Sequence, residues 1–250
     1  MIINKFLARS MATVLNSIFP ILLAVVLLAG CGFGPKVGAL QSASQFVELG
    51  GAEAVRVEIL FGAGTLNVAG GAEHLLDADF AYNVAELKPE VDSSKGQLVI
   101  RQPEVRGLPN LRNISAFRNE WNLRLNNKVP MELLMNVGAG SIDLRPADLS
   151  LARLEIHLGA TTGTIDLTGD WARDLEVIID SGAANITVLL PNDVGVRIDV
   201  DAGPTAVQTS GLTRDGDFYV NDAYGESPVT QQIALETGIG LVKLVVGDAE

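Results

Sequence analysis

The sequence comprises 250 residues with a formal net charge of −12, of which 48% are hydrophobic and only 5% aromatic. Nucleic acid and anionic lipid headgroups repel such an acidic chain, so the charge argues against a nucleic-acid-binding function. The single cysteine excludes an intramolecular disulfide. Stability must therefore come from a hydrophobic core, which a chain of this length can build.

Residues 1–31 have the layout of an export signal. Lys5 and Arg9 precede an apolar run from Ile18 to Leu28, which is shorter than the roughly 20 residues that a membrane-spanning helix needs. The segment that ends at Cys31, Leu-Ala-Gly-Cys, resembles the lipobox of bacterial lipoproteins. We predict that the signal is cleaved and that acyl chains on Cys31 tether the protein to the cell membrane on its extracytoplasmic side. Cleavage elsewhere, leaving a free thiol, is the alternative.

The remaining chain divides by composition into four parts. Residues 32–45 are rich in Gly, Pro and Ser, which predicts a flexible stalk. Residues 46–102 carry alternating apolar positions at Leu75–Tyr82 and Gln97–Arg101, which predicts an N-terminal β subdomain. Residues 103–120 are locally basic and predict a crossover loop, and residues 121–250 are repetitive.

A glycine-centred unit recurs through the body. Phe61–Val68 matches Val137–Leu144, and the pattern returns between residues 158 and 167. Further copies start at Ser181, Asp201 and Thr237. A recurrence of this kind, with a strand before and after each pair of glycines, predicts an all-β fold and favours a β-solenoid of stacked rungs. A meander or sandwich of hairpins is also compatible with the spacing.

These repeats, together with three further segments, resemble a known family. Val55–Gly64, Trp121–Asn126 and Val129–Leu133, followed by the Gly-Ala-Gly copies, are similar to bacterial toast-rack proteins, which are relatives of the C-terminal domain of LiaF-type cell-wall-active antibiotic response proteins. The resemblance implies a stacked β fold outside or beside the membrane and a link to envelope stress signalling. It implies no catalytic residues and no cofactor.

Two patterns suggest enzymes or zinc sites, and neither is convincing. Asp180, Ser181 and Gly182 form the Asp-Ser-Gly core of aspartic proteases, but the glycine coincides with the repeat, which already explains it. His74 and His157 lack the spacing of zinc ligands, and His157, between Ile156 and Leu158, is predicted to be an exposed strand histidine. We therefore predict that the protein is not an enzyme and requires no cofactor.

The weak candidates for binding residues lie in two groups. Asp143 and Asp166 occupy similar positions in consecutive repeats and could hold Ca²⁺ between rungs, although a solvated acidic ladder is the simpler interpretation. Contacts with another protein are expected from Tyr219 and Tyr224, in an insertion within the last repeat, and from Arg112 and Arg118 in the basic loop.

Two functions are compatible with these features. The first is a non-catalytic binding or sensory module of the cell envelope, which contacts another envelope protein. The alternative is a structural surface spacer that self-associates through its strand edges.

Overall fold

The structure, a computed structural model, describes residues 36–104, 116–147 and 149–247. The described residues from 38 to 104 and from 117 to 247 belong to one compact unit. The predicted signal, Cys31 and Arg112 lie outside the described residues, so the structure does not address them.

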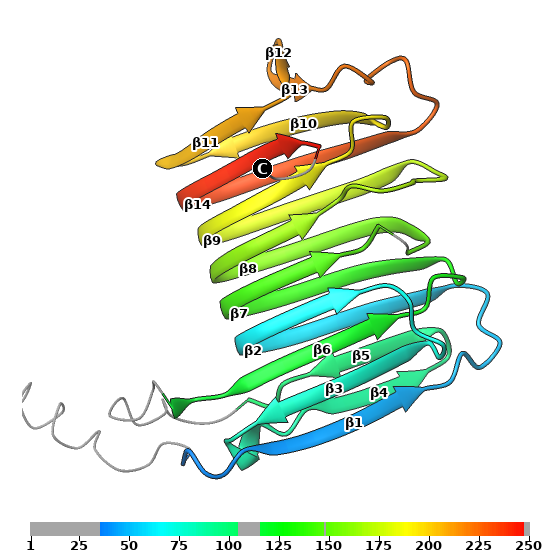
Figure 1. Cartoon of the computed structure of the whole chain (residues 1–250), viewed down its shortest axis with the longest axis vertical. Helices are drawn as coiled ribbons and strands as arrows, with labels where there is room; N and C mark the ends of the chain where they lie inside the picture. The colour runs from blue at the N-terminus through cyan, green and yellow to red at the C-terminus, as the bar shows by residue number, and fades with distance from the viewer. Residues whose placement is uncertain (1–35, 105–115, 148, 248–250) are drawn as a thin grey trace, which may run out of the picture. The chain divides into compact units, whose positions relative to one another are not determined.

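The described residues form one sheet of 14 strands, which confirms the expected all-β class (Figure 1). The structure also contains a 3-10 turn, Ala85–Leu87. None of the described segments is a helix long and apolar enough to cross a membrane. The strands are β1 (Gln41–Val47), β2 (Val55–Ala69), β3 (Leu76–Tyr82), β4 (Glu90–Ser94), β5 (Gln97–Arg101), β6 (Asn119–Leu125), β7 (Met131–Arg145), β8 (Leu151–Asp166), β9 (Leu175–Leu190), β10 (Gly195–Ala202), β11 (Thr205–Ser210), β12 (Thr213–Asp215), β13 (Phe218–Val220) and β14 (Thr230–Val246).

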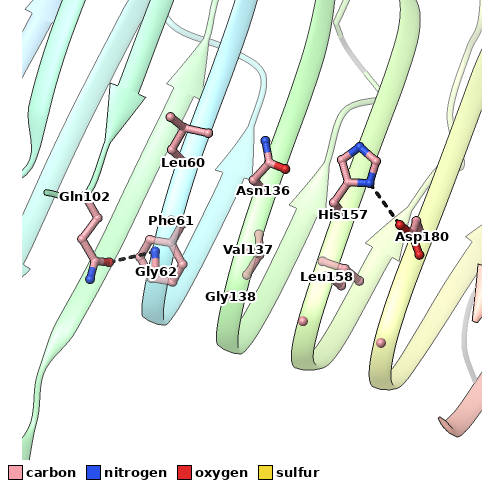
Figure 2. A pocket seen from close by; sticks show the side chains of 12 residues that line it. Leu60, Phe61, Gly62, Gln102, Asn136, Val137, Gly138, His157, Leu158 and Asp180 are labelled. Atoms are coloured by element: carbon pink, nitrogen blue, oxygen red, sulfur yellow. Dashed lines mark hydrogen bonds and ion pairs between the residues drawn. The ribbon is translucent and has the colours of Figure 1, made fainter. Parts of the chain in front are cut away.

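Five long strands form the centre of the sheet. β2, β7, β8, β9 and β14 pair in that order, all parallel. Each turns back on itself at the repeated glycines, as the ribbons in Figure 2 show. Pairing continues through the bend, so each repeat is one continuous strand rather than the two that the sequence predicts. We call the residues before the bend the leading half of each strand and those after it the trailing half.

Glycine is required at the bends because successive backbones approach closely there. Gly140 pairs with Gly64 in the neighbouring strand and has a φ of +127°, which side chains rarely tolerate. A Cβ on Gly140 would overlap the carbonyl oxygen of Gly64, and a Cβ on Gly138 would overlap that of Gly62. Glycine therefore recurs in the sequence because each bend needs it for close packing against the neighbouring strand.

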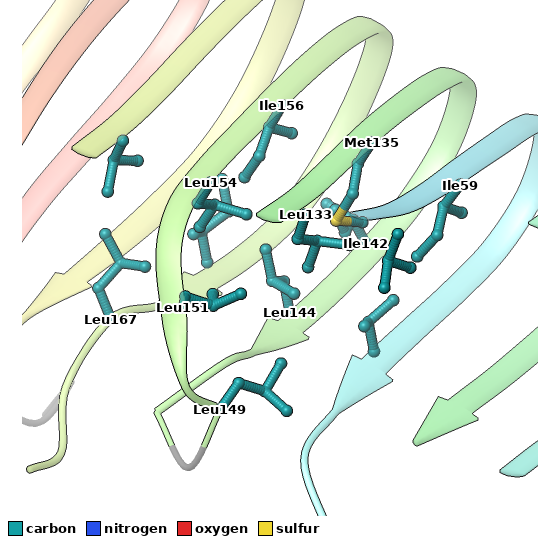
Figure 3. Packing of buried hydrophobic residues seen from close by; sticks show 14 of the residues in the cluster. Ile59, Leu133, Met135, Ile142, Leu144, Leu149, Leu151, Leu154, Ile156 and Leu167 are labelled. Carbon is teal, nitrogen blue, oxygen red and sulfur yellow. The ribbon is translucent and has the colours of Figure 1, made fainter. Parts of the chain in front are cut away.

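The core lies between the leading and trailing halves. In β7, Leu133 and Met135 of the leading half face Ile142 and Leu144 of the trailing half, and all four are almost fully buried (Figure 3). Equivalent positions are apolar and buried in the other long strands, for example Ile156 in β8. Neither half would bury this surface alone, so the bend and the core depend on each other.

The order of the last strands differs from their order in the sequence. β14 lies between β9 and β10, although β10 follows β9 in the chain. The repeat at Gly203 therefore packs against Gly238 instead of Gly182. The long interval between Gly203 and Gly238 is explained by this path, because the chain forms β10 to β13 first and then returns.

Two expected boundaries also change. Gln41–Gln45, assigned above to the stalk, pair with β3 as part of β1. The expected N-terminal subdomain is not separate, because β2 belongs to the central stack and pairs with β7 along nearly its whole length. β5, by contrast, spans the predicted residues Gln97–Arg101.

The bend predicts a large cost for adding a side chain at Gly140. We expect Gly140→Ala to lower the free energy of unfolding by about 3 kcal/mol, because the backbone is strained and Gly64 must move. Gly216→Ala is the control, since Gly216 also has a positive φ but open space around it. The control should cost about 1 kcal/mol. Equal losses in chemical denaturation would contradict the close-approach explanation.

Candidate functional site

A groove of about 560 Å³ follows the outside of the bends. Its floor includes Gly62, Gly138, Gly159 and Gly182, contributed by four consecutive strands of the stack. Leu60, Asn136, His157 and Asp180 line one side, and Figure 2 shows them as neighbours across β2, β7, β8 and β9.

The glycine floor of the groove follows from packing between strands. A Cβ at Gly159 would overlap the carbonyl oxygen of Gly138, just as one at Gly138 would overlap that of Gly62. The glycines are therefore needed by the fold whether or not a ligand binds. Any chemistry of the groove must come from the side chains beside them.

His157 is the titratable centre of the groove. Its Nε2 lies 2.9 Å from Glu155 Oε1, and its Nδ1 lies 3.4 Å from Asp180 Oδ2. The hydrogen bond to Glu155 is the main reason why the pKa of His157 is raised above 6.5, and the hydrogen bond to Asp180 adds to it, while partial burial opposes both. The exposed histidine predicted from the sequence is instead half-buried and held by two carboxylates.

The protease-like motif is split between two faces of its strand. Asp180 is exposed and faces His157, whereas Ser181 is only 3% exposed and donates a hydrogen bond of 2.9 Å to Thr237 Oγ1. An aspartic protease needs two carboxylates that share a proton, whereas the ion-pair partner of Asp180 here is His157. The geometry supports the structural interpretation of this motif.

The expected stacking of Asp143 and Asp166 is wrong. Asp143 pairs with Thr164, and Asp166 lies two residues further along β8. The two carboxylates would stack if Gly163 paired with Gly140, but the sheet pairs Gly140 with Thr161 and Gly163 with Ile142. Asp143 instead forms an ion pair of 2.6 Å with Arg145. Among the described residues, no group of three or more His, Cys, Asp and Glu side chains is placed to hold a metal ion.

Polar side chains close the bend where the central stack ends beyond β2. Gln102 Oε1 accepts hydrogen bonds from the N–H groups of Gly62 and Ala63, at 3.0 and 3.2 Å. Asn119 donates to the carbonyl oxygen of Ala63 at 2.6 Å and to Gln102 Oε1 at 2.8 Å, and accepts a bond of 3.0 Å from Trp121 Nε1. These side chains replace the backbone partners that a further bend would supply.

Tyr219 and Tyr224 lie at the other end of the strand order. Tyr219 is half-buried in β13 and packs against the core, while Tyr224 is 37% exposed. The loop between β13 and β14 is held by Asn221, whose Nδ2 donates to the carbonyl oxygens of Pro191 and Val194, at 3.0 and 2.8 Å. Tyr219 therefore belongs to the cap that β13 and the following loop form over the last strands. It is not freely available for contact with a partner.

Arg118 is far from these tyrosines in the sheet. It precedes β6, near the opposite end of the strand order, and its side chain lies 3.4 Å from Glu120. The structure therefore does not bring the predicted contact residues together.

A further hollow contains a residue that sequence reasoning missed. Phe46 is 62% exposed, and its ring lies 4.5 Å from that of His74, which is bound to Asp77 at 2.7 Å. Phe46 is the first residue of the predicted β subdomain and directly follows the Ser- and Gln-rich end of the predicted stalk. An aromatic residue beside such a segment was the available signal.

Comparison with known protein families identifies the family to which the chain belongs. The family model for the N-terminal domain of toast-rack proteins, DUF2154, matches residues 36–189. The chain belongs to the toast-rack family. This confirms the resemblance seen in the sequence.

One solved structure is similar to this toast-rack protein over most of its length. It is that of a candidate cell adhesion protein from Clostridium sporogenes, with 32% identity and a TM-score of 0.79, covering 84% of this chain and 100% of that chain. A candidate adhesin from Bacteroides fragilis covers 85% of this chain and 100% of that chain at 9% identity, but its TM-score of 0.37 is too low to support an argument. No curated protein in the comparison matches the chain.

The cap over the bend of β2 predicts that Asn119 is important for the stability of this toast-rack protein. We expect Asn119→Ala to lower the free energy of unfolding by about 2–4 kcal/mol, because it leaves buried partners unsatisfied. Asn122→Ala is the matched control, since its exposed side chain accepts one bond from Asn67. The control should cost less than about 1 kcal/mol. Similar losses for the two variants in urea denaturation would show that Asn119 does not cap the bend.

The two histidines should titrate through separate carboxylates. The pKa of each is raised, mainly by Glu155 for His157 and by Asp77 for His74. We expect Glu155→Gln to lower the pKa of His157 in an NMR titration and to leave that of His74 unchanged, and Asp77→Asn to do the reverse. Because a raised pKa favours the folded protein only while the imidazole is protonated, this stabilisation is present below pH 6.5 and is lost as the pH rises through the folded pKa. A shift of both histidines in either variant would refute the separation.

Proposed function

We propose that this toast-rack protein is a non-catalytic binding module displayed at the cell surface. The observation that carries the proposal is the likeness to the Clostridium sporogenes protein, described as a candidate cell adhesion protein, over the full length of that chain. A shared family at 32% identity supports a shared type of role.

Lipid on Cys31 is the proposed attachment to the membrane. The lipobox-like segment supports it, as does the position of Cys31 ahead of β1, where a tether would not interrupt the sheet. The acidic composition would keep the body away from anionic headgroups. The protein would thus be held at an extracytoplasmic surface with its sheet in solvent.

The five bent strands are interpreted as rungs of a short, open β-solenoid. Their parallel pairing in register supports this interpretation. Such a scaffold presents rows of outward side chains on two faces, which suits recognition better than catalysis. A non-enzymatic role is further supported by the pairing of Asp180 with His157 instead of with a second carboxylate.

A more specific proposal is that the binding module has a sensory role in envelope stress. It comes from the resemblance to LiaF-type proteins and requires contact with another envelope protein. Tyr224 and Arg118 are the exposed described residues proposed for that contact, together with Arg112. Tyr219 packs against the core and is not proposed for it. Because Arg118 and Tyr224 lie near opposite ends of the strand order, a partner would have to engage one end at a time or span the stack.

Removal of the tether tests the proposal directly. We expect the full-length chain, expressed in a bacterial host, to fractionate with membranes and to be labelled by antibody on intact cells. Cys31→Ser should shift most of the protein to the soluble fraction, because no lipid can be attached. Ser94→Ala, at the exposed end of β4, is the control and should stay with the membrane.

Photo-cross-linking from Arg118 and Tyr224 then tests for a partner on cells. Capture of one envelope protein from either site would support the sensory form. A Cys31→Ser chain that stays on membranes, or a wild-type chain that antibody reaches only after lysis, would contradict the tethered surface module.

A further inference from the structure

Two rows of side chains cross the outer face of the sheet where the trailing half of β2 continues into β6, β3 and β1. The strands involved, β1, β3, β6, β2 and β7, are neighbours in the strand order (Figure 1). Strand pairing gives a first row of Ser44, Asp79, Asn122, Asn67 and Asp143. The second row, two residues away in each strand, is Phe46, Asp77, Arg124, Ala69 and Arg145. Paired residues, and residues two apart in a strand, point to the same face. We call these ten residues the β1–β7 surface.

Two hollows lie over the β1–β7 surface and share part of their lining. One has a volume of about 660 Å³ and contains Phe46, and the other has a volume of about 360 Å³ and contains Asn67. Asp79 and Arg124 line both. The two hollows therefore belong to one continuous surface, with Asp79 and Arg124 at its centre. It crosses four strand spacings, or about 19 Å.

The polar side chains of this surface hold one another in place and still keep unused hydrogen-bonding groups. Ser44 donates to Asp79 Oδ1 at 2.6 Å, and Asn67 Nδ2 donates to Asn122 Oδ1 at 2.8 Å. Among the described residues, the Asp79 Oδ2, Asn67 Oδ1 and Asn122 Nδ2 atoms have no hydrogen-bond partner. The guanidinium of Arg124 forms no hydrogen bond or ion pair within the same residues and acts on Asp77 only through its charge. Donors and acceptors in fixed positions are therefore open to a ligand.

Phe46 adds an aromatic surface beside these polar groups. Its ring centroid lies 4.5 Å from that of His74, and His74 Nδ1 is held 2.7 Å from Asp77 Oδ1. The side chain of Phe46 is nevertheless 62% exposed. The ring is thus held in position by His74 while most of it stays open to solvent, so it can receive the apolar side of a ligand.

These groups together fit a neutral sugar chain. A sugar hydroxyl both donates and accepts hydrogen bonds, so it can use the carboxylate of Asp79 and the N–H groups of Arg124 and Asn122 at once. The C–H groups on one side of a sugar ring form an apolar surface that can cover an aromatic ring. In the two rows, carboxylates outnumber guanidinium groups, which disfavours an anionic polymer.

A protein partner matches this surface less well. Stable protein contacts bury roughly 800 Å² on each partner, around a centre that is rich in apolar and aromatic side chains. Phe46 is the only large apolar side chain in the two rows, all of which the structure describes. The remaining side chains, apart from Ala69, are polar or charged. Contact with a protein is therefore treated as an outcome of the test.

We propose that the β1–β7 surface binds a neutral oligosaccharide, with Phe46 stacked against a sugar ring and Asp79 and Arg124 hydrogen-bonded to sugar hydroxyl groups. The inference rests on the proposed function, because it names the class of ligand for the surface-displayed binding module. The central position of Asp79 and Arg124, which line both hollows, lets them contact neighbouring sugars of one chain.

Binding to the full-length chain in fluorescent phosphatidylcholine vesicles tests the proposal. The probes are arrayed neutral oligosaccharides, including cellotetraose, chitotetraose and mannotetraose, with polygalacturonate as the anionic comparison and empty vesicles as the blank. We expect at least one neutral oligosaccharide to bind and polygalacturonate not to bind. The dissociation constant of that oligosaccharide is then measured by isothermal titration.

Removal of the aromatic ring should weaken binding. We expect Phe46→Ala to raise the dissociation constant about tenfold, because the stacking contact is lost. Ile239→Ala is the matched control, since Ile239 is 63% exposed on β14 and lies outside both hollows. Phe46→Trp should retain binding and change its indole fluorescence when the sugar is added. Trp121 and Trp171 are buried, so the change reports on position 46.

Removal of the central polar groups is the second substitution test. Asp79→Asn and Arg124→Gln should each raise the dissociation constant about tenfold, because each loses a charged hydrogen-bonding group. Lys243→Gln is the matched control for charge. Lys243 continues the row of Asp79 through Asp143, Thr164 and Thr187 but lies outside both hollows. Circular dichroism and thermal unfolding confirm that the variants are folded.

Several outcomes would overturn the inference. They are failure of every neutral oligosaccharide to bind, preference for polygalacturonate, and a loss in Ile239→Ala or Lys243→Gln that equals the loss in Phe46→Ala. A photo-cross-linker at Phe46 that captures a protein and no sugar on intact cells would assign the surface to a protein partner instead. If no sugar binds while Cys31-dependent display is retained, only the inference is lost. If display fails, the proposed function is lost, and the vesicles still decide whether the chain binds sugar.

Discussion

The close approach of successive backbones at the glycine bends is the constraint on which the rest of the structure depends. A Cβ at Gly138 or Gly140 would overlap a carbonyl oxygen of the neighbouring strand, so the strands stack only where glycine or a compatible turn is present. Since the pairing runs through the bend, the register of the leading half fixes that of the trailing half. The same contact thus determines which side chains enter the core and which form the outer rows.

A stack of this kind must end, and each end is closed differently. Beyond β2, Gln102 and Asn119 supply side-chain hydrogen bonds to the bend in place of a further backbone. At the other end, β14 is inserted between β9 and β10, so the last long strand of the chain is paired on both sides. Asn221 then fastens the returning loop to Pro191 and Val194. Buried polar side chains thereby satisfy groups that would otherwise be left unpaired.

The sequence was sufficient for the fold class, the family and the location of the bends, because these depend on local patterns such as alternating apolar residues around paired glycines. It was insufficient where pairing order matters. Spacing along the chain could not show that β14 lies between β9 and β10, and two nearby glycines in β8 allowed a register in which Asp143 and Asp166 appeared to stack. β1 was missed because its Ser and Gln residues are typical of linkers, and only pairing with β3 makes it a strand.

Charge provides the last link between the fold and a surface role. Side-by-side approach of two copies brings acidic faces together, and at physiological ionic strength such repulsion acts over about 8 Å. The negative charge would therefore oppose clustering of tethered copies. A protein kept apart from its neighbours in this way would leave the outward rows of its stack free for recognition.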